Sequence, residues 1–399
     1  MRSVSSISIV LILWLAGLCA AAQFAKMGLV LPELQQLYPE AGAASGFLIT
    51  LISLVGALFG LIAGILVGQL GPRRVLLAGM MLGCLISAIQ SFELSLGFLL
   101  ATRIVEGASH LAIVVSAPTL IAHYSSDRMR ASAMTLWGTF FGVSFALTAW
   151  LGIPLAAEHG VHALFLAHAI ILVITTVLIV FLVPKGLPMT KDQSPVRDTY
   201  ALASLFKRHK QAWGSPYIAA PAIGWLFYTI TYVALLAILP SQIPADQRTL
   251  AAALMPLASI ASSMTLGVAL LWRFTAIEVV NIGFLAAICF ALLFLFEYDK
   301  VIICILLFSA LGLVQGASFA AIPQLNTAAP NQALANGTLA QGGNIGNLCG
   351  TPVLLVLFNY GGNVAMISLV IACYAIAIYT HVLFGRRRAL EKAGISAGN

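Results

Sequence analysis

Long apolar runs alternate with short polar segments along almost the whole chain. A helix needs roughly 20 apolar residues to cross a bilayer core of about 30 Å. Twelve runs reach about that length, and the pattern therefore predicts an all-α integral membrane protein with twelve transmembrane helices. We place these spans at residues 7–31, 45–69, 75–91, 95–123, 131–157, 161–183, 216–240, 249–272, 276–296, 301–322, 334–358 and 363–384.

The first run also has the outline of a secretory signal, because Arg2 precedes the apolar residues 7–18 and three alanines follow at 20–22. The apolar character, however, continues as far as Pro32, and cleavage near residue 22 would leave an odd number of spans. We therefore expect this segment to be kept as the first transmembrane helix.

An internal repeat divides the chain into two halves. Pro32 ends the first run, and Pro240 ends the seventh run 208 residues later. The fourth run holds EGAS at 106–109 and the tenth holds QGAS at 315–318, an offset of 209. A Gly-x-x-x-Gly pair begins at residue 138 in the fifth run and at residue 342 in the eleventh, an offset of 204. Three matches in order at a nearly constant offset indicate two six-helix repeats.

The repeat sets the predicted domain organisation. An N-terminal six-helix bundle covers residues 1–183, and a C-terminal bundle with a short basic tail covers residues 216–399. Residues 184–215 between them form the longest polar stretch, with prolines at 188 and 195 and the basic run KRHK at 207–210. We interpret this stretch as a cytoplasmic linker.

The basic residues are distributed unevenly among the loops. If both termini are cytoplasmic, sixteen Lys and Arg residues lie on the inside, and only Arg248 and Lys300 lie outside. Because Lys and Arg are retained on the cytoplasmic side, we predict cytoplasmic termini in a plasma membrane, the inner membrane of a bacterium. The formal net charge of +7 then belongs to a rim that faces anionic lipid and indicates no nucleic-acid partner.

The sequence lacks the usual signatures of a metal site, a cofactor site or an ATPase. All six cysteines lie in apolar spans without metal-ligand spacing, and no phosphate-binding glycine loop is followed by Lys and Ser or Thr. His159, His162 and His168 follow Glu158, but no further ligand accompanies them, so we interpret them as solvated loop histidines. We predict that the protein is not an enzyme and has neither metal nor cofactor.

Two motifs resemble the major facilitator superfamily, whose plan of two parallel six-helix repeats matches the whole chain. The family's loop between spans 2 and 3 reads G-x-x-x-D-R-x-G-R-K, and residues 64–74 here read GILVGQLGPRR. The resemblance implies a conformational role for Gly64, Gly71, Arg73 and Arg74. Gly68 stands in place of the family's acidic residue. In the family that residue pairs across the interface between the halves and stabilises the outward-facing state, so this role is in doubt here.

The family's fourth-span motif, R-x-x-Q-G followed by small residues, is matched by RIVEGAS at 103–109. Spans 4 and 5 also resemble the cyanate-permease-like branch. The fifth span lacks the Gly-Pro-Gly pattern of drug and proton antiporters, which argues against the common multidrug subclass.

Three charged residues lie inside the spans, where charge is costly and usually marks a site. Lys26 is in the first span, and Arg103 and Glu106 are in the fourth. The resemblance implies that the first, fourth, seventh and tenth spans line a central cavity. We therefore expect Lys26 and Arg103 to bind a substrate, with Gln23 beside them, and Glu106 or His110 to carry a coupled proton. A guanidinium suits bidentate binding of a carboxylate.

Structural alternatives remain open for each of these residues. Arg103 and Glu106, one turn apart, could simply neutralise each other, and Lys26 could extend outward to the headgroups. His110 could be a neutral histidine with its hydrogen bond inside the bundle.

The second half has no charge at the equivalent positions, which are Ala234, Gly312, Gln315 and Phe319. Its expected lining is polar and aromatic, and we include Trp225, Tyr228, Tyr232 and Gln315 among the substrate-binding residues. The asparagines and glycines of the eleventh span are interpreted mainly as helix packing.

These features predict a secondary active transporter that moves a small polar and anionic solute by alternating access, coupled to protons. The predicted partners are the solute, a proton and the lipid bilayer, and we expect a monomer. An exporter of amphiphilic compounds is the first alternative. A membrane-embedded enzyme or sensor on the same scaffold is a remote one.

Overall fold

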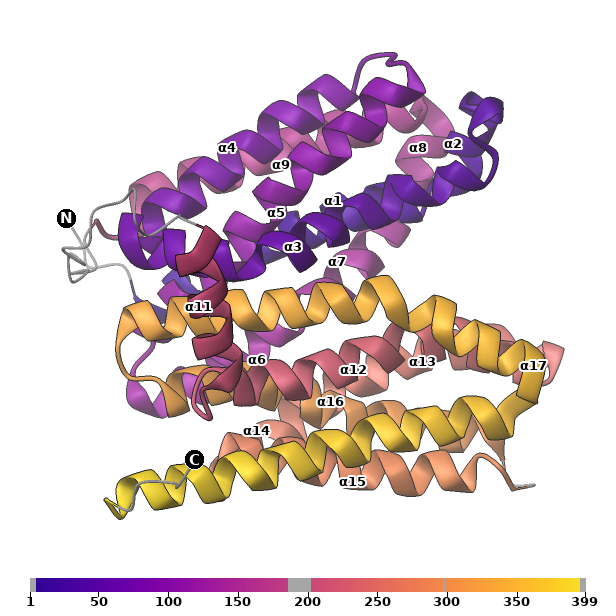
Figure 1. Cartoon of the computed structure of the whole chain (residues 1–399). Helices are drawn as coiled ribbons and strands as arrows, with labels where there is room; N and C mark the ends of the chain where they lie inside the picture. The colour runs from indigo at the N-terminus through magenta and orange to yellow at the C-terminus, as the bar shows by residue number, and fades with distance from the viewer. Residues whose placement is uncertain (1–4, 186–201, 297–298, 395–399) are drawn as a thin grey trace.

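The computed structural model describes residues 5–185, 202–296 and 299–394, and every regular element within these ranges is helical (Figure 1). The first half contains α1 (Ser6–Gly28), α2 (Leu31–Leu37), a 3-10 segment (Pro39–Gly46), α3 (Phe47–Leu70), α4 (Pro72–Gln90), α5 (Leu96–Tyr124), α6 (Asp127–Gly138), α7 (Phe140–Leu147), a π-helical turn (Thr148–Gly152), α8 (Ile153–His159) and α9 (Val161–Leu182).

The second half begins after α11 (Leu202–Gly214). It contains α12 (Ala219–Ile238), a 3-10 turn (Leu239–Gln242), α13 (Ala245–Ser262), a π-helical turn (Ser263–Gly267), α14 (Val268–Leu271), α15 (Ala276–Leu293), α16 (Lys300–Leu325) and α17 (Ala329–Lys392).

The twelve predicted spans are confirmed. In the described part of the chain, eleven helical stretches are long and apolar enough to cross a membrane. The last of them, α17, holds the eleventh and twelfth predicted spans, which are divided at Gly362, where φ is +62°. Glycine accepts this left-handed conformation without a Cβ clash, so the chain can reverse there.

The fifth span is less regular than predicted. In place of one helix over 131–157, the chain forms α6, α7 and α8, with a π-helical turn at Thr148–Gly152. Pro154 lies just beyond this turn and has no N–H to bond to the carbonyl one turn earlier. The widened turn accommodates the missing bond.

The two halves meet at the end of the molecule that carries both termini. In Figure 1 the ribbons of the halves converge on that side and diverge toward the other. The main contact is a seam between α3 and α17, where a Cβ on Gly60 would lie 2.6 Å from Cβ of Gln341 and one on Gly337 would lie 2.8 Å from Cα of Gly64. Only glycine permits this close approach. We call this contact the α3–α17 seam.

Polar side chains of α17 strengthen the contact between the halves. Asn336 Nδ2 donates to Thr119 Oγ1 of α5 at 3.1 Å, and Gln341 Nε2 donates to the Ala57 carbonyl of α3 at 2.9 Å. Asn344 donates to Ala340 O of its own helix and packs against Gly56. The packing interpretation of the eleventh span therefore agrees with the structure.

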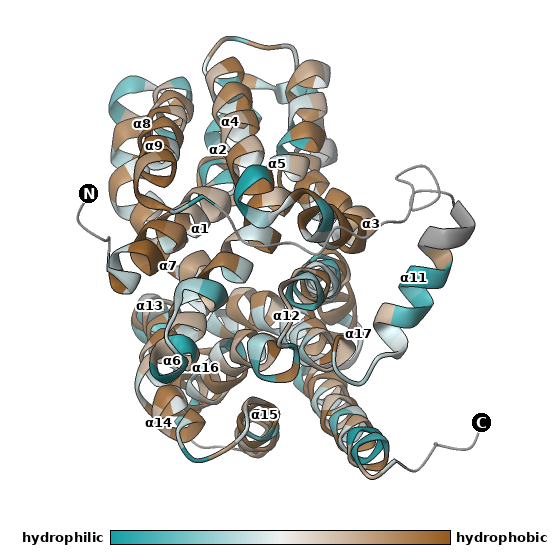
Figure 2. Ribbon diagram, turned by 90° about the vertical axis from the view of Figure 1, so that its left-hand side faces the viewer, coloured by the Kyte–Doolittle hydropathy of each residue, from teal (hydrophilic) through white to brown (hydrophobic). Residues whose placement is uncertain are grey.

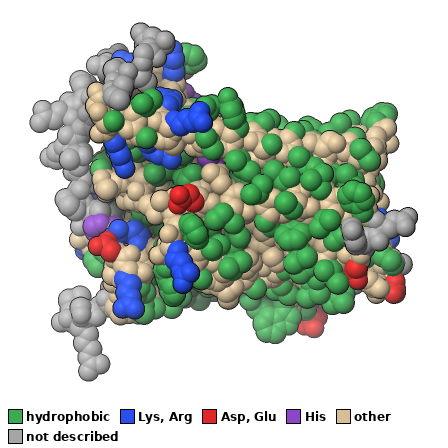
Figure 3. All heavy atoms as spheres, turned by 90° about the horizontal axis from the view of Figure 1, so that it is seen from below, with side chains coloured by type: hydrophobic (Ala, Val, Ile, Leu, Met, Phe, Trp, Pro, Cys, Tyr) green, Lys and Arg blue, Asp and Glu red, His purple; other side chains and the backbone are tan. Residues whose placement is uncertain are grey.

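The outer surface matches a bilayer. Many large apolar side chains of the membrane helices are exposed, including Phe59 and Phe181, and Figure 2 shows apolar residues along the outside of the helices. In Figure 3 a broad hydrophobic band separates an end with most of the visible Lys and Arg from an end with acidic residues. The basic end is the one that carries the termini.

Candidate functional site

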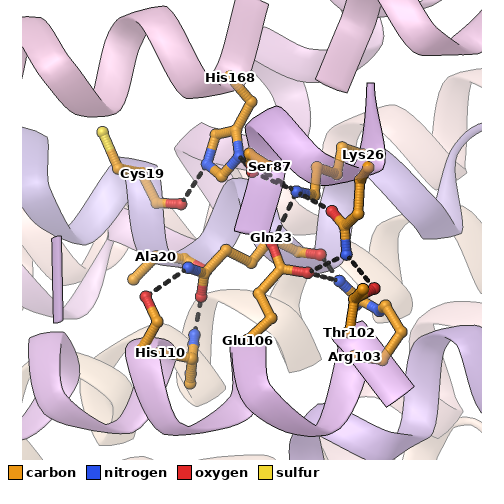
Figure 4. A network of polar contacts seen from close by, with 12 residues as sticks. Cys19, Ala20, Gln23, Lys26, Ser87, Thr102, Arg103, Glu106, His110 and His168 are labelled. Atoms are coloured by element: carbon orange, nitrogen blue, oxygen red, sulfur yellow. Dashed lines mark hydrogen bonds and ion pairs between the residues drawn. The ribbon is translucent and has the colours of Figure 1, made fainter. Parts of the chain in front are cut away.

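Glu106 is the centre of a buried polar network in the first half (Figure 4). Its Oε1 lies 2.6 Å from Lys26 Nζ of α1. Its Oε2 accepts from Arg103 Nη1, one turn earlier on α5, and from Gln90 Nε2 of α4 at 2.9 Å. Two cations and one amide therefore surround a single carboxylate.

Lys26 is held by groups from three other helices. Its ammonium donates to Ser87 Oγ at 2.6 Å and to Gln90 Oε1 at 2.7 Å, both on α4, besides its ion pair with Glu106. His168 Nδ1 of α9 lies 3.3 Å away. An ammonium has three N–H groups, and the three shorter contacts satisfy them.

Arg103 uses its whole guanidinium inside the bundle. Nε donates to the Leu48 carbonyl of α3 at 2.6 Å, Nη2 donates to the Gln23 carbonyl of α1 at 2.9 Å, and Nη1 pairs with Glu106. The side chain of Gln23 donates in turn to Ser109 Oγ at 2.9 Å. The arginine thus joins three helices through a fork that lysine could not reproduce.

The network carries an unbalanced charge away from solvent. Lys26 is 1% exposed, and Arg103 and Glu106 are 0% exposed. Glu106 is the only acidic residue among the buried residues of the described chain. When all three groups are ionised, the cluster has one positive charge in excess, and such a charge is costly in a low-dielectric interior.

The structure contradicts two interpretations made from the sequence, one for Lys26 and one for His168. The alternative in which Lys26 extends to the headgroups is wrong, because its ammonium is buried among polar groups that satisfy it. The assignment of His168 to a solvated loop is also wrong, because it lies inside α9 and is 4% exposed. His159 is exposed as predicted, and His162 is half-buried in the first turn of α9.

The structure also adds residues that the sequence analysis missed. His168 Nε2 donates to the Cys19 carbonyl at 2.9 Å, so its Nδ1 is free to accept from the Ser87 hydroxyl at 2.7 Å. Gln90 also donates to Thr102 Oγ1. Ser87 and Gln90 are three residues apart in an apolar span, and this shared helical face was the available signal.

His110 lies on the same helix as Arg103 and Glu106 but makes different contacts. Its Nδ1 is 3.0 Å from the Ala20 carbonyl, and its ring packs edge-on against Phe24, with 5.0 Å between centroids. A carbonyl only accepts, so Nδ1 must carry the hydrogen. Within the described residues the hydrogen bond of His110 is made by Nδ1, and the side chain is 6% exposed, which leaves Nε2 for another partner. This nitrogen can accept a proton or bind a ligand.

A chain of aromatic contacts leads from His110 to the second half. From Phe24 it passes to Phe141, with 5.8 Å between centroids, and then through neighbouring rings of α6 and α7 to Trp137. Trp137 contacts Phe319 of α16 at 6.4 Å across the boundary between the halves. Phe319 contacts Trp225 of α12, which begins a stack with Tyr228 and Tyr232.

The remaining predicted residues occupy separate places. Gln315 Nε2 donates to the Gly138 carbonyl at 2.6 Å and its Oε1 accepts from Ser259, so it joins the halves. Gly64 lies in the α3–α17 seam. Gly71, with φ of +89°, joins α3 to α4. Arg73 and Arg74 lie in the first turn of α4, where Arg73 donates to the Val180 and Val183 carbonyls at the end of α9 and Arg74 is exposed.

The sequence profile described as Major Facilitator Superfamily matches residues 13–333. The chain belongs to this family. Membership of this family agrees with the prediction of a membrane transporter that is not an enzyme. The cyanate-permease-like branch stays a prediction.

Curated relatives match over part of the chain. Inner membrane transport protein YajR of Escherichia coli (strain K12) is 27% identical over 177 residues, which are 43% of this chain and 38% of that protein. The 4-hydroxybenzoate transporter PcaK of Pseudomonas aeruginosa is 28% identical over 177 residues, 44% of this chain and 38% of that protein. The aligned segments thus span well under half the length of these relatives.

Solved structures agree over nearly the whole fold. The human organic anion transporter MFSD10 has a TM-score of 0.76 at 17% identity, with 94% of this chain and 99% of that chain covered. FucP in its outward conformation has a TM-score of 0.75 at 16% identity, with 95% and 98% covered. At these identities the likeness confirms the fold alone.

Proposed function

We propose that the protein is a secondary active transporter that moves a small polar anion by alternating access, together with a proton. The observation that carries this proposal is the buried cluster in which Lys26 and Arg103 share the single carboxylate of Glu106. An arriving anion would supply the missing countercharge. Neither cation is exposed in the described conformation. The anion would therefore either be attracted by the electric field of the cluster without touching it, or bind Arg103 after a rearrangement of the helices.

Two groups could carry the proton. Glu106 would take up a proton if an anion drew Arg103 away from it, because a desolvated carboxyl that loses a cationic partner favours its neutral form. His110 could take up a proton directly at Nε2 and then donate that N–H to the anion. The geometry favours His110, because Glu106 is already bonded to three donors.

We expect His110→Asn to separate exchange from coupling. Asparagine can still donate to the Ala20 carbonyl, but it cannot take up a proton near neutral pH. The variant should still exchange substrate across proteoliposomes, although more slowly than the parent because the anion loses one donor, and it should fail to accumulate substrate under a pH gradient. If gradient-driven accumulation survives unchanged, His110 does not carry the coupled proton.

The aromatic contacts support a narrower substrate class within this proposal. Rings from both halves lie between His110 and the Trp225–Tyr228–Tyr232 stack. A planar aromatic acid could stack on such rings while its carboxylate faces the positive cluster. The name of the relative PcaK, a 4-hydroxybenzoate transporter, is consistent with this substrate class. The same rings would also suit the alternative function, export of an amphiphilic compound.

Reconstitution into proteoliposomes tests the proposed function. Radiolabelled aliphatic and aromatic carboxylates should enter faster than neutral sugars of similar size, and an imposed pH gradient should change their final accumulation. Reversing the gradient reports the preferred direction and so distinguishes uptake from export. Equal transport of anions and neutral solutes would contradict the anion assignment.

We also propose that both termini are cytoplasmic in the inner membrane of a bacterium. The supporting observation is the concentration of Lys and Arg at the end that carries the termini. Reporter fusions after Asn399 and within residues 202–214 should both report the cytoplasm, whereas a fusion between Arg248 and Thr249 should report the outside. A cytoplasmic signal from the third fusion would contradict the topology.

A further inference from the structure

A pocket of about 510 Å³ lies beside the linker helix α11. Its lining residues come from α11, from the residue before α12 and from the first turns of α17, and they are Lys207, Arg208, Gln211, Ala212, Ile218 and Leu334. The lining therefore combines two cations and an amide with three apolar side chains. None of the six residues is acidic.

The structure holds α11 firmly in this position. Trp213 Nε1 donates to Gln341 Oε1 of α17 at 3.0 Å. Arg387 donates to the Gly214 carbonyl at 3.1 Å, and Arg388 donates to the Pro216 carbonyl at 2.6 Å, so the basic end of α17 caps the turn between α11 and α12. In Figure 2, α11 lies at one side of the molecule, with one end near α17.

The pocket also lies at the depth of the membrane surface. Ile218 immediately precedes α12, which crosses the bilayer. Ala212 packs with Leu61 and Ile65 of α3 in a small apolar cluster that includes Ile218 and Leu334 at its edge. Phe206, the residue before Lys207, is 75% exposed. An exposed aromatic ring beside basic residues is typical of a helix that rests on lipid.

We propose that this pocket binds an anionic glycerophospholipid. Its phosphate would lie against Lys207 and Arg208, and the first carbons of its acyl chains would lie against Ala212, Ile218 and Leu334. A free phosphate compound would use the cations but leave this apolar wall without a partner, which is why the observations favour a lipid. The bound lipid would join α11 to α12 and α17 next to the α3–α17 seam.

Thermal unfolding of the purified full chain in a neutral detergent tests the assignment. Short-chain phosphatidylglycerol should raise the melting temperature, and phosphatidylcholine of the same chain length should raise it much less. The double variant Lys207→Gln with Arg208→Gln should lose at least half of the phosphatidylglycerol shift. The matched control Arg74→Gln with Arg273→Gln, two exposed arginines outside the pocket, should keep the parental shift.

Further additions distinguish the source of the phosphate. Inorganic phosphate and glycerophosphoglycerol, the headgroup without acyl chains, should each produce less than half of the lipid shift. A shift as large as that of the lipid would assign the pocket to a free anion and overturn the proposal. Equal lipid shifts in the two double variants would overturn it as well, because the binding would then be spread over the whole basic rim.

Discussion

Glu106→Gln is expected to destabilise the protein far more than Lys26→Met. The Gln variant leaves Lys26 and Arg103 buried together with no countercharge, and loss of one partner from a buried ion pair costs about 3–5 kcal/mol. Lys26→Met instead leaves a neutral Arg103–Glu106 pair. Its cost is the loss of the Lys26 ammonium from Gln90 Oε1 and Glu106 Oε1. No net charge is left buried, so the expected cost is about 1–3 kcal/mol for a buried acceptor that loses its donor.

The melting temperatures of both variants in detergent would measure this order. Glu158→Gln is the matched control, because that carboxylate is 75% exposed in the same half of the protein, and it should melt with the parent. Equal destabilisation by Glu106→Gln and Lys26→Met would mean that the cluster has no excess of positive charge, and would remove the observation on which the anion proposal rests.

The spans and the halves could be predicted because they depend on local properties of the sequence. Run length and the excess of Lys and Arg are visible without any knowledge of packing, and the turn at Gly71 and Pro72 follows from backbone conformation. The broken fifth span was harder to predict, because an apolar run looks the same whether its helix is continuous or contains a π-helical turn.

The candidate site was only partly predictable. The cost of charge in a membrane drew attention to Lys26, Arg103 and Glu106, but the partners of Lys26 on α4 and α9 lie 61 to 142 positions away in the chain. Which face of α1 meets α4 and α9 is decided by packing of the whole bundle. The prediction for His168 is wrong for this reason. Its short distance in the sequence from His159 and His162 suggested a common loop, whereas His168 alone is buried among the helices.

The contacts of the linker were also not visible in the sequence. Its prolines and basic run predict a polar connection, and residues 186–201 of it lie outside the described residues. The helical part, α11, packs through Ala212 and Trp213. Two isolated apolar residues in a polar stretch do not indicate from the sequence that they are packing contacts. Their importance appears only when Gln341 of α17 is placed beside them.

Lys26→Met is also expected to weaken anion transport greatly at low substrate concentration while the protein stays folded. A unit charge about 8 Å from a bound anion contributes about 2 kcal/mol at an effective dielectric constant of about 20, which corresponds to roughly 30-fold in affinity. Removing the excess charge should therefore raise the substrate concentration needed for half-maximal transport by about that factor. Initial rates in proteoliposomes over a range of substrate concentrations would measure it.

Arg103→Lys should fail for a different reason, although it preserves the charge. The Leu48 carbonyl, the Gln23 carbonyl and Glu106 bond to three different nitrogens of the guanidinium. A single ammonium nitrogen cannot stand at all three positions, so at least one buried acceptor would lose its donor. Lys300→Met, a matched loss of a lysine at the start of α16 in the other half, should transport like the parent. If Lys26→Met does so too, the excess charge does not act on the substrate, and the cluster serves only to hold α1, α4, α5 and α9 together.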